Sequence, residues 1–382
     1  MGQLRTEATM LQATLRHLVP GTADFEKYNA ELGKVTARMD ELKGKGKEAS
    51  WSIGGLADKF NRYAALGASV IAAGTGMVLS VQKILDFNGK LSDSYVNVQK
   101  TTGMTRKEVD ELSKSFGLLK TRTSRADLLN IAAVGGELGV AKEEIASFVK
   151  VMNKSAVALG DAFEGGPEVV ANKLGKIKGL YEELRNSGVE PAFESVGSAL
   201  NELGADGTAS AHNVAEFVQA VGTIPGKLKP SIQQALGLGA AFEESGLMAE
   251  IAGNNYGKLI GIASLDYAAF AKVMGRPAEE LKQLINTDPT EFFLQFAQSL
   301  KGLDATELSK ILDYLKLNDQ QVKQVLGAAS DNVQKFRDKI SLAGTAMSEA
   351  TSLTEEYDLK NNNLAATLER LKKNGCGLVY FR

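Results

Sequence analysis

Residues 288–326 read DPTEFFLQFAQSLKGLDATELSKILDYLKLNDQQVKQVL, and this stretch decides the fold class. It contains three helix starts at short intervals, each opened by a side chain that can cap a first turn: Asp288, Asp304 and Asn318. Pro289 follows the first cap and Glu291 takes the third helical position, and both favour a helix N-terminus. Apolar residues then recur every three or four positions. The pattern predicts three short helices with tight turns over residues 288–340.

Helix starts with good capping chemistry also occur earlier, at Thr105–Glu108 and Ser124–Asp127. Strand signals are thin, because no alternating run of β-branched and aromatic residues lies between Asn-Gly or Asp-Gly turns. Proline does not occur between residues 22 and 166, nor after Pro289, and helices need such proline-free runs. We therefore predict an all-α fold.

Residues 1–50 contain the clearest periodicity in the sequence. Apolar residues step by three and four positions in two runs: Leu4, Ala8, Leu11, Leu15 and Leu18, then Phe25, Tyr28, Leu32, Val35, Met39 and Leu42. Pro20-Gly21 separates the runs, so the a/d seam is in two pieces. The pattern predicts a helical hairpin or a kinked coiled coil, with self-association through residues 4–42. Two amphipathic helices packed on the rest of the chain are the alternative.

The segment Tyr63–Gln82 carries no charge over twenty residues and is rich in alanine and glycine. A helix of this length spans about 30 Å, the thickness of a bilayer core. Three interpretations stay open: a buried or oligomer-facing helix, a latent membrane-inserting segment, and a constitutive transmembrane helix. Small residues at four-residue spacing favour close approach of helices. The segment begins too late in the chain to be a signal peptide.

We expect four parts along the chain. They are a coiled coil or hairpin at 1–50, the apolar helix and a following helix at 51–100, a helical core at 101–300, and a helical C-terminal part at 301–382. The last helix is predicted over residues 346–373, with Leu364, Leu368 and Leu371 on one face. Because an apolar sequence follows that charged helix directly, we expect the C-terminal part to be truncated.

The composition excludes several classes of protein. Among 382 residues, 44 are Lys or Arg and 46 are Asp or Glu, and a net charge of −2 argues against a protein that mainly grips nucleic-acid phosphates. The single cysteine, Cys376, excludes a disulfide framework and a cysteine-rich zinc site. His17 and His212 lie far apart in sequence and leave little for histidine-based chemistry. Glycine is abundant, and we expect some glycines to end helices, as at Gly135, Gly222 and Gly327.

The sequence offers no catalytic constellation. Residues 222–227 and 253–258 place a lysine after spaced glycines, but both are one residue shorter than a phosphate loop, and leucine follows the lysine where Mg²⁺ binding needs Ser or Thr. Adjacent carboxylates diverge on a helix and are expected on solvated faces: Glu143 and Glu144, Glu182 and Glu183, Glu243 and Glu244. His212 is expected at a surface or a helix cap. We predict no catalytic residue, cofactor, metal site, small-molecule ligand or enzymatic activity.

The order of features along the chain is more informative than any single motif. A charged heptad region and an apolar segment precede LDFNGKLS at 85–92, TGMTRKEVDEL at 102–112 and IAAVGGELGV at 131–140. The stretch GGELGV within the last of these is the most specific part. TDPTEFFLQFAQSL at 287–300 and the residues from 344 onward add to the pattern. This succession resembles the N-terminal core region of the phage tail tape measure protein family over about residues 55–375.

The resemblance implies a structural role. Proteins of this family are extended helical rulers that occupy the lumen of a growing phage tail and set its length. The implied partners are tail tube subunits, tail-assembly chaperones, and baseplate or tail-tip proteins. The protein would reside in the host cytoplasm before assembly and in the virion tail afterwards. The apolar segment 63–82 would assist genome delivery through transient contact with the host membrane.

Two other functions stay open at this point. A membrane-inserting helical protein, such as a pore-former or toxin-like module, would use the apolar segment 63–82. An intracellular coiled-coil scaffold would bind its partners through residues 1–50. Members of the resembled family are usually much longer than 382 residues, so the chain would be an N-terminal portion of such a ruler.

Overall fold

The computed structural model describes residues 11, 15, 22, 25–27, 29–35, 91–363 and 366–367. The chain divides into two compact units, Met1–Lys90 and Leu91–Arg382. All regular structure in the described residues is helical, which confirms the all-α class. The four-part organisation predicted from the sequence is not decided by this division and stays a prediction.

Several predictions about the termini concern residues that the structure does not describe. The apolar segment Tyr63–Gln82 and Cys376 lie outside the described residues, so the role predicted for that segment stays a prediction. Within the described residues, no helix combines the length and apolar character that crossing a bilayer requires.

The first unit is described at a few heptad positions. Val35 is buried, and Leu11 and Leu32 pack against it. Leu11 belongs to the first run of the predicted seam and Val35 to the second, so a contact joins the two runs. Leu15, another seam position, is also buried.

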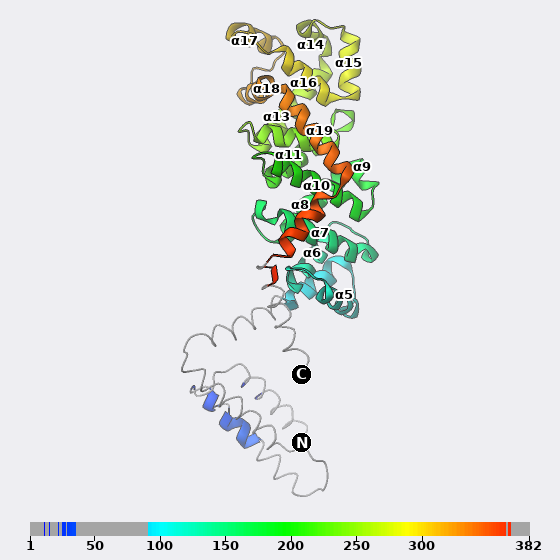
Figure 1. The fold of residues 1–382 in the computed structure, drawn as a ribbon, viewed down its shortest axis with the longest axis vertical. Helices are drawn as coiled ribbons and strands as arrows, with labels where there is room; N and C mark the ends of the chain where they lie inside the picture. The colour runs from blue at the N-terminus through cyan, green and yellow to red at the C-terminus, as the bar shows by residue number, and fades with distance from the viewer. Residues whose placement is uncertain are drawn as a thin grey trace. The chain divides into compact units, whose positions relative to one another are not determined.

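The second unit is an assembly of mostly short helices (Figure 1). Residues 91–102 are helical. The elements that follow are α5 (Arg106–Leu118), α6 (Arg125–Glu137), η1 (Lys142–Glu144), α7 (Ile145–Leu159), η2 (Gly160–Ala162), α8 (Pro167–Leu180), α9 (Glu182–Arg185), α10 (Val189–Asp206), α11 (Ala211–Gly222), η3 (Gly226–Leu228), α12 (Ile232–Glu243), α13 (Ala249–Leu265), α14 (Tyr267–Met274), α15 (Ala278–Thr287), α16 (Pro289–Ser299), α17 (Ala305–Tyr314), α18 (Gln320–Asp331), α19 (Val333–Glu349) and α20 (Ser352–Asn361).

The helices α5 to α18 form a stack in which neighbours in sequence are mostly neighbours in space. We call residues 106–331 the stack. Figure 1 shows α5 at one end of the second unit and α14, α15 and α17 at the other. Helices α6, α7 and α8 pack together, α11 packs on α12 and α13, and α16 packs on α15 and α18. This serial arrangement puts most contacts between elements close in sequence.

The last two helices break the serial order. α19 packs lengthwise on α12 and α10, and α20 packs on α7 and α10 (Figure 1). We call residues 333–361 the strap, because they run back from the α16–α18 end of the stack toward α7. The strap brings residues near 360 to residues near 120 and 160.

Aromatic rings occupy the middle of the core although aromatic residues are few. The ring of Phe242 on α12 lies 5.5 Å from Phe217 of α11, 5.9 Å from Phe293 of α16 and 4.8 Å from Phe336 of α19, measured between centroids. All four side chains are buried. Edge-to-face and tilted pairs at these distances are favourable beyond the area they bury. Phe242 of α12 therefore packs against α11 and α16 of the stack and against α19 of the strap.

The predicted helix caps are mostly confirmed. The Oγ1 atom of Thr105 accepts a hydrogen bond from the Glu108 amide, and Asp288 and Asp304 cap α16 and α17 in the same way. The cap predicted at Asn318 is wrong by one residue. Asp319 accepts from the Gln321 amide and α18 begins at Gln320. The side-chain amide of Asn318 instead donates to Asp313 at the end of α17.

Two predictions of helix boundaries near the end of the chain are wrong. Residues 288–340 contain the start of a fourth helix, because α19 begins at Val333. The single helix predicted over residues 346–373 is broken at Ala350, whose φ of 52° is left-handed. Neither glycine nor proline lies at that break, and tertiary contacts of α20 with α10 hold it in place.

The expected role of glycine as a helix terminator is only partly right. Gly222 is the last residue of α11, but Gly135 and Gly327 lie inside α6 and α18. The turn after α6 is made by Gly139, with a φ of 75°. A methyl group at Gly135 would overlap the ring of Phe148, so this glycine allows α6 and α7 to pack closely.

Candidate functional site

The two lysine-containing glycine segments do not form loops that could cradle a phosphate. Residues 253–258 lie inside α13, where Gly253 faces Ala220 and Gly257 faces Ile224. Residues 222–227 run from the last residue of α11 into η3. The glycines of residues 253–258 therefore allow α13 to pack closely on its neighbours, and those of residues 222–227 lie where the chain passes from α11 to η3.

The adjacent carboxylates behave in two ways. Glu143 and Glu144 are exposed, as are Glu182 and Glu183, although Glu183 also accepts a hydrogen bond from the Ile232 amide at 3.1 Å. The prediction of a solvated face is wrong for the third pair. Glu243 accepts hydrogen bonds from the Ser210 amide, at 3.0 Å, and from the Asn213 side chain, at 2.7 Å, whereas Glu244 binds Lys339 of the strap. These two carboxylates point to different helices, so they do not converge on one substrate.

His212 belongs to a cluster of charged groups between α8 and α11. Its Nε2 lies 3.2 Å from Glu216, which also accepts a 2.6 Å hydrogen bond from Lys173. The ring of Phe163 meets the imidazole edge to face at 5.4 Å. The hydrogen bond from Lys173 holds the pKa of the Glu216 carboxyl below its ordinary value. Of the two roles predicted for His212, a surface or a helix cap, capping is wrong because Ser210 is the N-cap of α11, whereas the His212 side chain is 27% exposed.

The described residues contain no group of three or more His, Cys, Asp or Glu side chains arranged to hold a metal ion. A cleft of about 220 Å³ lies between α12, α16 and the strap and includes Gln234, Asp288, Glu291 and Arg337. These four groups already bond to one another in pairs. Gln234 donates to Asp288 at 2.9 Å, and Arg337 donates to Glu291 at 2.7 Å.

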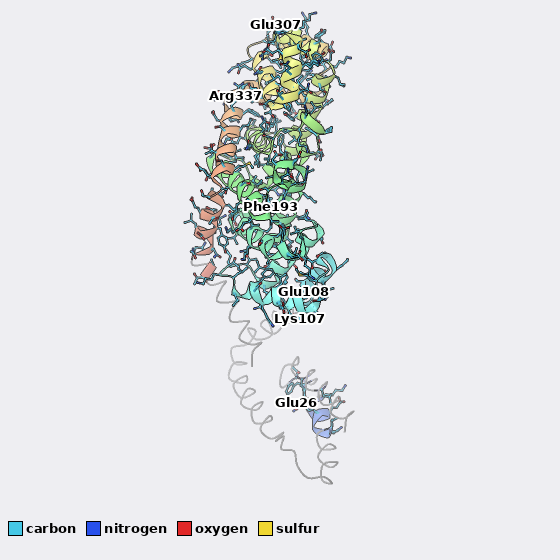
Figure 2. All side chains as sticks on the ribbon, turned by 90° about the vertical axis from the view of Figure 1, so that its right-hand side faces the viewer. Glu26, Lys107, Glu108, Phe193, Glu307 and Arg337 are labelled. Atoms are coloured by element: carbon cyan, nitrogen blue, oxygen red, sulfur yellow. The ribbon has the colours of Figure 1, made fainter. Side chains whose placement is uncertain are left out.

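The most elaborate polar structure in the described residues is the seam between the strap and the stack. Figure 2 shows α19 along one side of the stack, with Arg337 labelled on it. The closest approach occurs at Gly237 of α12. A methyl group at this position would overlap the backbone of Ile340, so only glycine permits this spacing of the two helices.

Lys339 is the best-buried cation of the seam, with 6% of its side chain exposed. Its ammonium donates to Asp206 at 2.8 Å and to Glu244, whose own side chain is 12% exposed. Burial alone lowers the pKa of Lys339, but the two carboxylates outweigh it and the net pKa is raised. Lys339 therefore stays charged and joins α19 to the ends of α10 and α12.

Two basic side chains that precede Lys339 on α19 also bind the stack. Lys335 donates to the hydroxyl of Ser245 at 2.9 Å, and Arg337 reaches Glu291 of α16. Strap residues thus supply the cations, and stack residues supply the acceptors. This charge complementarity fixes the register of α19, since a shift by one residue would separate every pair.

The start of α20 is held by α10. Leu353 is fully buried and fills the space left by the missing side chain of Gly197. Its amide donates to the Ser198 hydroxyl at 3.1 Å, and the Asn201 side chain donates to the Ser352 hydroxyl at 2.7 Å. Glycine and serine on α10 therefore form a socket for the first turn of α20.

The end of α20 is held by loops beside α5 and α7. The Asn361 side chain donates to the Lys120 carbonyl at 2.7 Å and accepts from the Arg122 amide at 2.9 Å. Lys360 donates to the carbonyl of Ala158 and to Asp161, each at 2.8 Å. The hydrogen bond from Lys360 keeps the pKa of Asp161 below its ordinary value.

Sequence reasoning missed this seam. Lys339 and Lys360 look like solvated residues in the sequence, because their acceptors lie 95 to 202 positions away. One signal was present: Gly237 and Gly239 interrupt an otherwise apolar helical run, which indicates close approach of another backbone. Chemically, the seam can fasten two structural elements. It contains no nucleophile paired with a base.

Comparison with known proteins supplies a family for the stack. The profile of a family described as "Phage-related minor tail protein" matches residues 106–315, which is more than half of the chain. No curated protein and no solved structure matches. The matched range holds every stack residue that binds Lys339, Lys360 or Arg337, whereas the strap lies outside it.

Proposed function

Because the chain belongs to the phage-related minor tail protein family, we propose that it is a tape measure component of a phage tail. In this role it scaffolds assembly of the tail tube and its length contributes to the length of the tail. The observation that carries the proposal is the family match over residues 106–315. The role is structural and needs no catalytic group.

The architecture supports a ruler in two ways. Most contacts in the stack join elements close in sequence, so each added helix would lengthen the stack. The heptad pattern in residues 4–42 has the spacing of a helix that can pack against a copy of itself or a partner helix. Each residue of a helical tape contributes about 1.5 Å.

We propose tail tube subunits as the main partners, with tail-assembly chaperones and baseplate or tail-tip proteins during assembly. The tail lumen is the proposed location in the finished particle. With a formal net charge of −2, the chain lacks the cationic excess that non-specific nucleic-acid binding would require. Protein surfaces are therefore the expected partners of this chain.

An in-frame deletion in the intact phage tests the ruler. In the extended tape inside the tail the two heptad runs lie end to end, so removing residues 11–38, which are 28 residues, would shorten a helical tape by about 42 Å. Tail length is measured by electron microscopy. A matched variant replaces the same residues with an unrelated heptad sequence of equal length. We expect shorter tails from the deletion and tails of unchanged length from the replacement. Unchanged tail length after the deletion would refute the proposal.

A further inference from the structure

The bend between α19 and α20 rests on one residue in a costly conformation. Ala350 has φ 52° and ψ 32°, the left-handed region, and its amide donates to the Ala346 carbonyl at 2.9 Å. Chains normally place glycine or asparagine at such a position. Alanine is the residue most favourable to a continuous helix and is disfavoured in the left-handed region by about tenfold.

The local sequence has one helix-start signal at this place, Ser352 with Glu355 three residues later, but the N-cap of α20 is Thr351 and no side-chain capping hydrogen bond forms there. Residues 345–374 contain neither glycine nor proline. Apolar residues at steps of three and four run through α19 to the bend: Val333, Phe336, Ile340, Ala343, Met347 and Ala350. Tyr357, seven residues further on, shares their face only if the helix is continuous, whereas Thr354 and Asn361 on that face are polar. The sequence of Leu364, Leu368 and Leu371 continues the same pattern.

The bend is therefore maintained from outside the strap. Leu353, Ser352 and Asn361 are buried against α10 and the 120–122 loop, and each makes a hydrogen bond to the stack there. The Leu353 amide is bound to the Ser198 hydroxyl. In a continuous helix the same amide would donate to the Glu349 carbonyl, four residues earlier. The two arrangements compete for one donor.

We propose that residues 333–361 are a two-state conformational device. In the closed state α20 is bent onto α10 and α7, as described above. In the open state α20 leaves the stack, Ala350 becomes right-handed, and α19 and α20 join in one helix about 43 Å long. Relief of the left-handed alanine offsets part of the lost contacts. The inference rests on the fold of the strap and does not depend on the tape measure role.

Spin labels on the strap of the full chain distinguish the two states. Cys376, the only cysteine, is first replaced by serine, and labels are attached through Ser341→Cys and Leu359→Cys, both at exposed positions. In a continuous helix these positions are 18 residues apart, five full turns, with a separation of about 27 Å. The bent strap gives a shorter distance by pulsed electron paramagnetic resonance.

The double substitution Leu353→Ala and Asn361→Ala weakens both ends of the α20 socket. We expect it to increase the population at the 27 Å separation by tenfold or more without loss of helical circular dichroism. Adding Ala350→Gly should lower the population at the 27 Å separation by about tenfold, because glycine tolerates the bend and disfavours the continuous helix. If the double variant fails to fold, Asn361→Ala alone gives the same test with a smaller shift.

Lys316 provides the matched control. It is the other described residue besides glycine with a positive φ, 58°, and it lies between α17 and α18, outside the strap. Lys316→Gly should leave the distance distribution unchanged. Two results would overturn the proposal: short, broadened distances with loss of helicity in the released variants, which means that α20 simply unfolds, or populations that do not respond to Ala350→Gly.

Discussion

Gly237 of α12 lies directly against the backbone of Ile340 in α19, with no room between them for a methyl group. This contact sets the distance between the strap and the stack, and the lysine anchors Lys335 and Lys339 of α19 precede it along the helix. The abundance of glycine in the sequence thus has a structural use that is specific to helix crossings. It allows a polar, lysine-rich helix to pack closely on an apolar one.

Substitution of Gly237 by alanine should destabilise the protein by about 1–3 kcal/mol, because the added methyl group pushes α19 away from α12. The measurement is the free energy of unfolding from urea titration. Gly327→Ala is the control: Gly327 lies inside α18 with open space where the methyl group would go. The control should stabilise by about 0.5–1 kcal/mol. Equal effects of both substitutions would contradict the close approach.

Lys339→Met should destabilise by about 3–5 kcal/mol, because it leaves the nearly buried Glu244 carboxylate without its cation. Adding Glu244→Gln should recover much of that loss, since the unpaired charge is then removed. Urea unfolding of the two variants and the single Glu244→Gln variant forms a double-mutant cycle. Strictly additive effects of the two substitutions would show that the ion pair does not operate.

Phe242→Ala should cost about 3–5 kcal/mol, because it removes a buried ring that contacts three other helices through their aromatic residues. The matched control is Leu118→Ala, at a side chain that is 85% exposed, and its effect should be within about 0.5 kcal/mol. Thermal unfolding followed by circular dichroism measures both variants. A loss below 1 kcal/mol at Phe242 would mean that the ring is not a core element.

The Glu108 carboxyl should titrate far below its ordinary pKa of 4.5, at about 2. Lys142 donates to it at 2.7 Å, and the amide of Thr105 donates to it as well. Because the pKa is lowered in the folded state, this group stabilises the start of α5 above about pH 4.5, and the contribution is lost as the pH falls through 2. Carbon-detected NMR of the Glu108 side chain measures the midpoint.

Lys142→Ala provides the comparison for that titration. Removing the nearest cation should raise the Glu108 midpoint toward 4.5, while the capping hydrogen bonds from Thr105 keep it from returning fully. A wild-type midpoint near 4.5 would show that the Lys142 contact is absent in solution.

The sequence predicts the local elements of this fold well. Caps at Thr105, Ser124, Asp288 and Asp304 depend on residues within three positions of each other, so the sequence contains the full signal. The apolar spacing also identifies α16, α17 and α18. The sequence predicts Asn318 as a cap where the structure uses Asp319, because both residue types can cap and the Asn318 side chain instead donates to Asp313.

The contacts of the strap could not be predicted in the same way. The bend at Ala350 opposes the intrinsic preference of alanine and follows from contacts with α10, about 150 residues earlier in sequence. Burial of Lys339 likewise depends on Asp206 and Glu244, which come from two other helices. Single-sequence periodicity contains no information about such pairs, because any exposed lysine would look the same.

Asn361 is bonded to Lys120 and Arg122, although 241 and 239 residues separate these partners along the chain. Under tension applied at residues 91 and 361, the load passes through the first helices of the unit, this contact and the neighbouring contacts of Lys360 with Ala158 and Asp161. The helices α11 to α18 lie off that load path, so most of the second unit is held as stored length. Rupture of the Asn361 and Lys360 contacts is then the event that transfers force to the interior and begins to lengthen the chain.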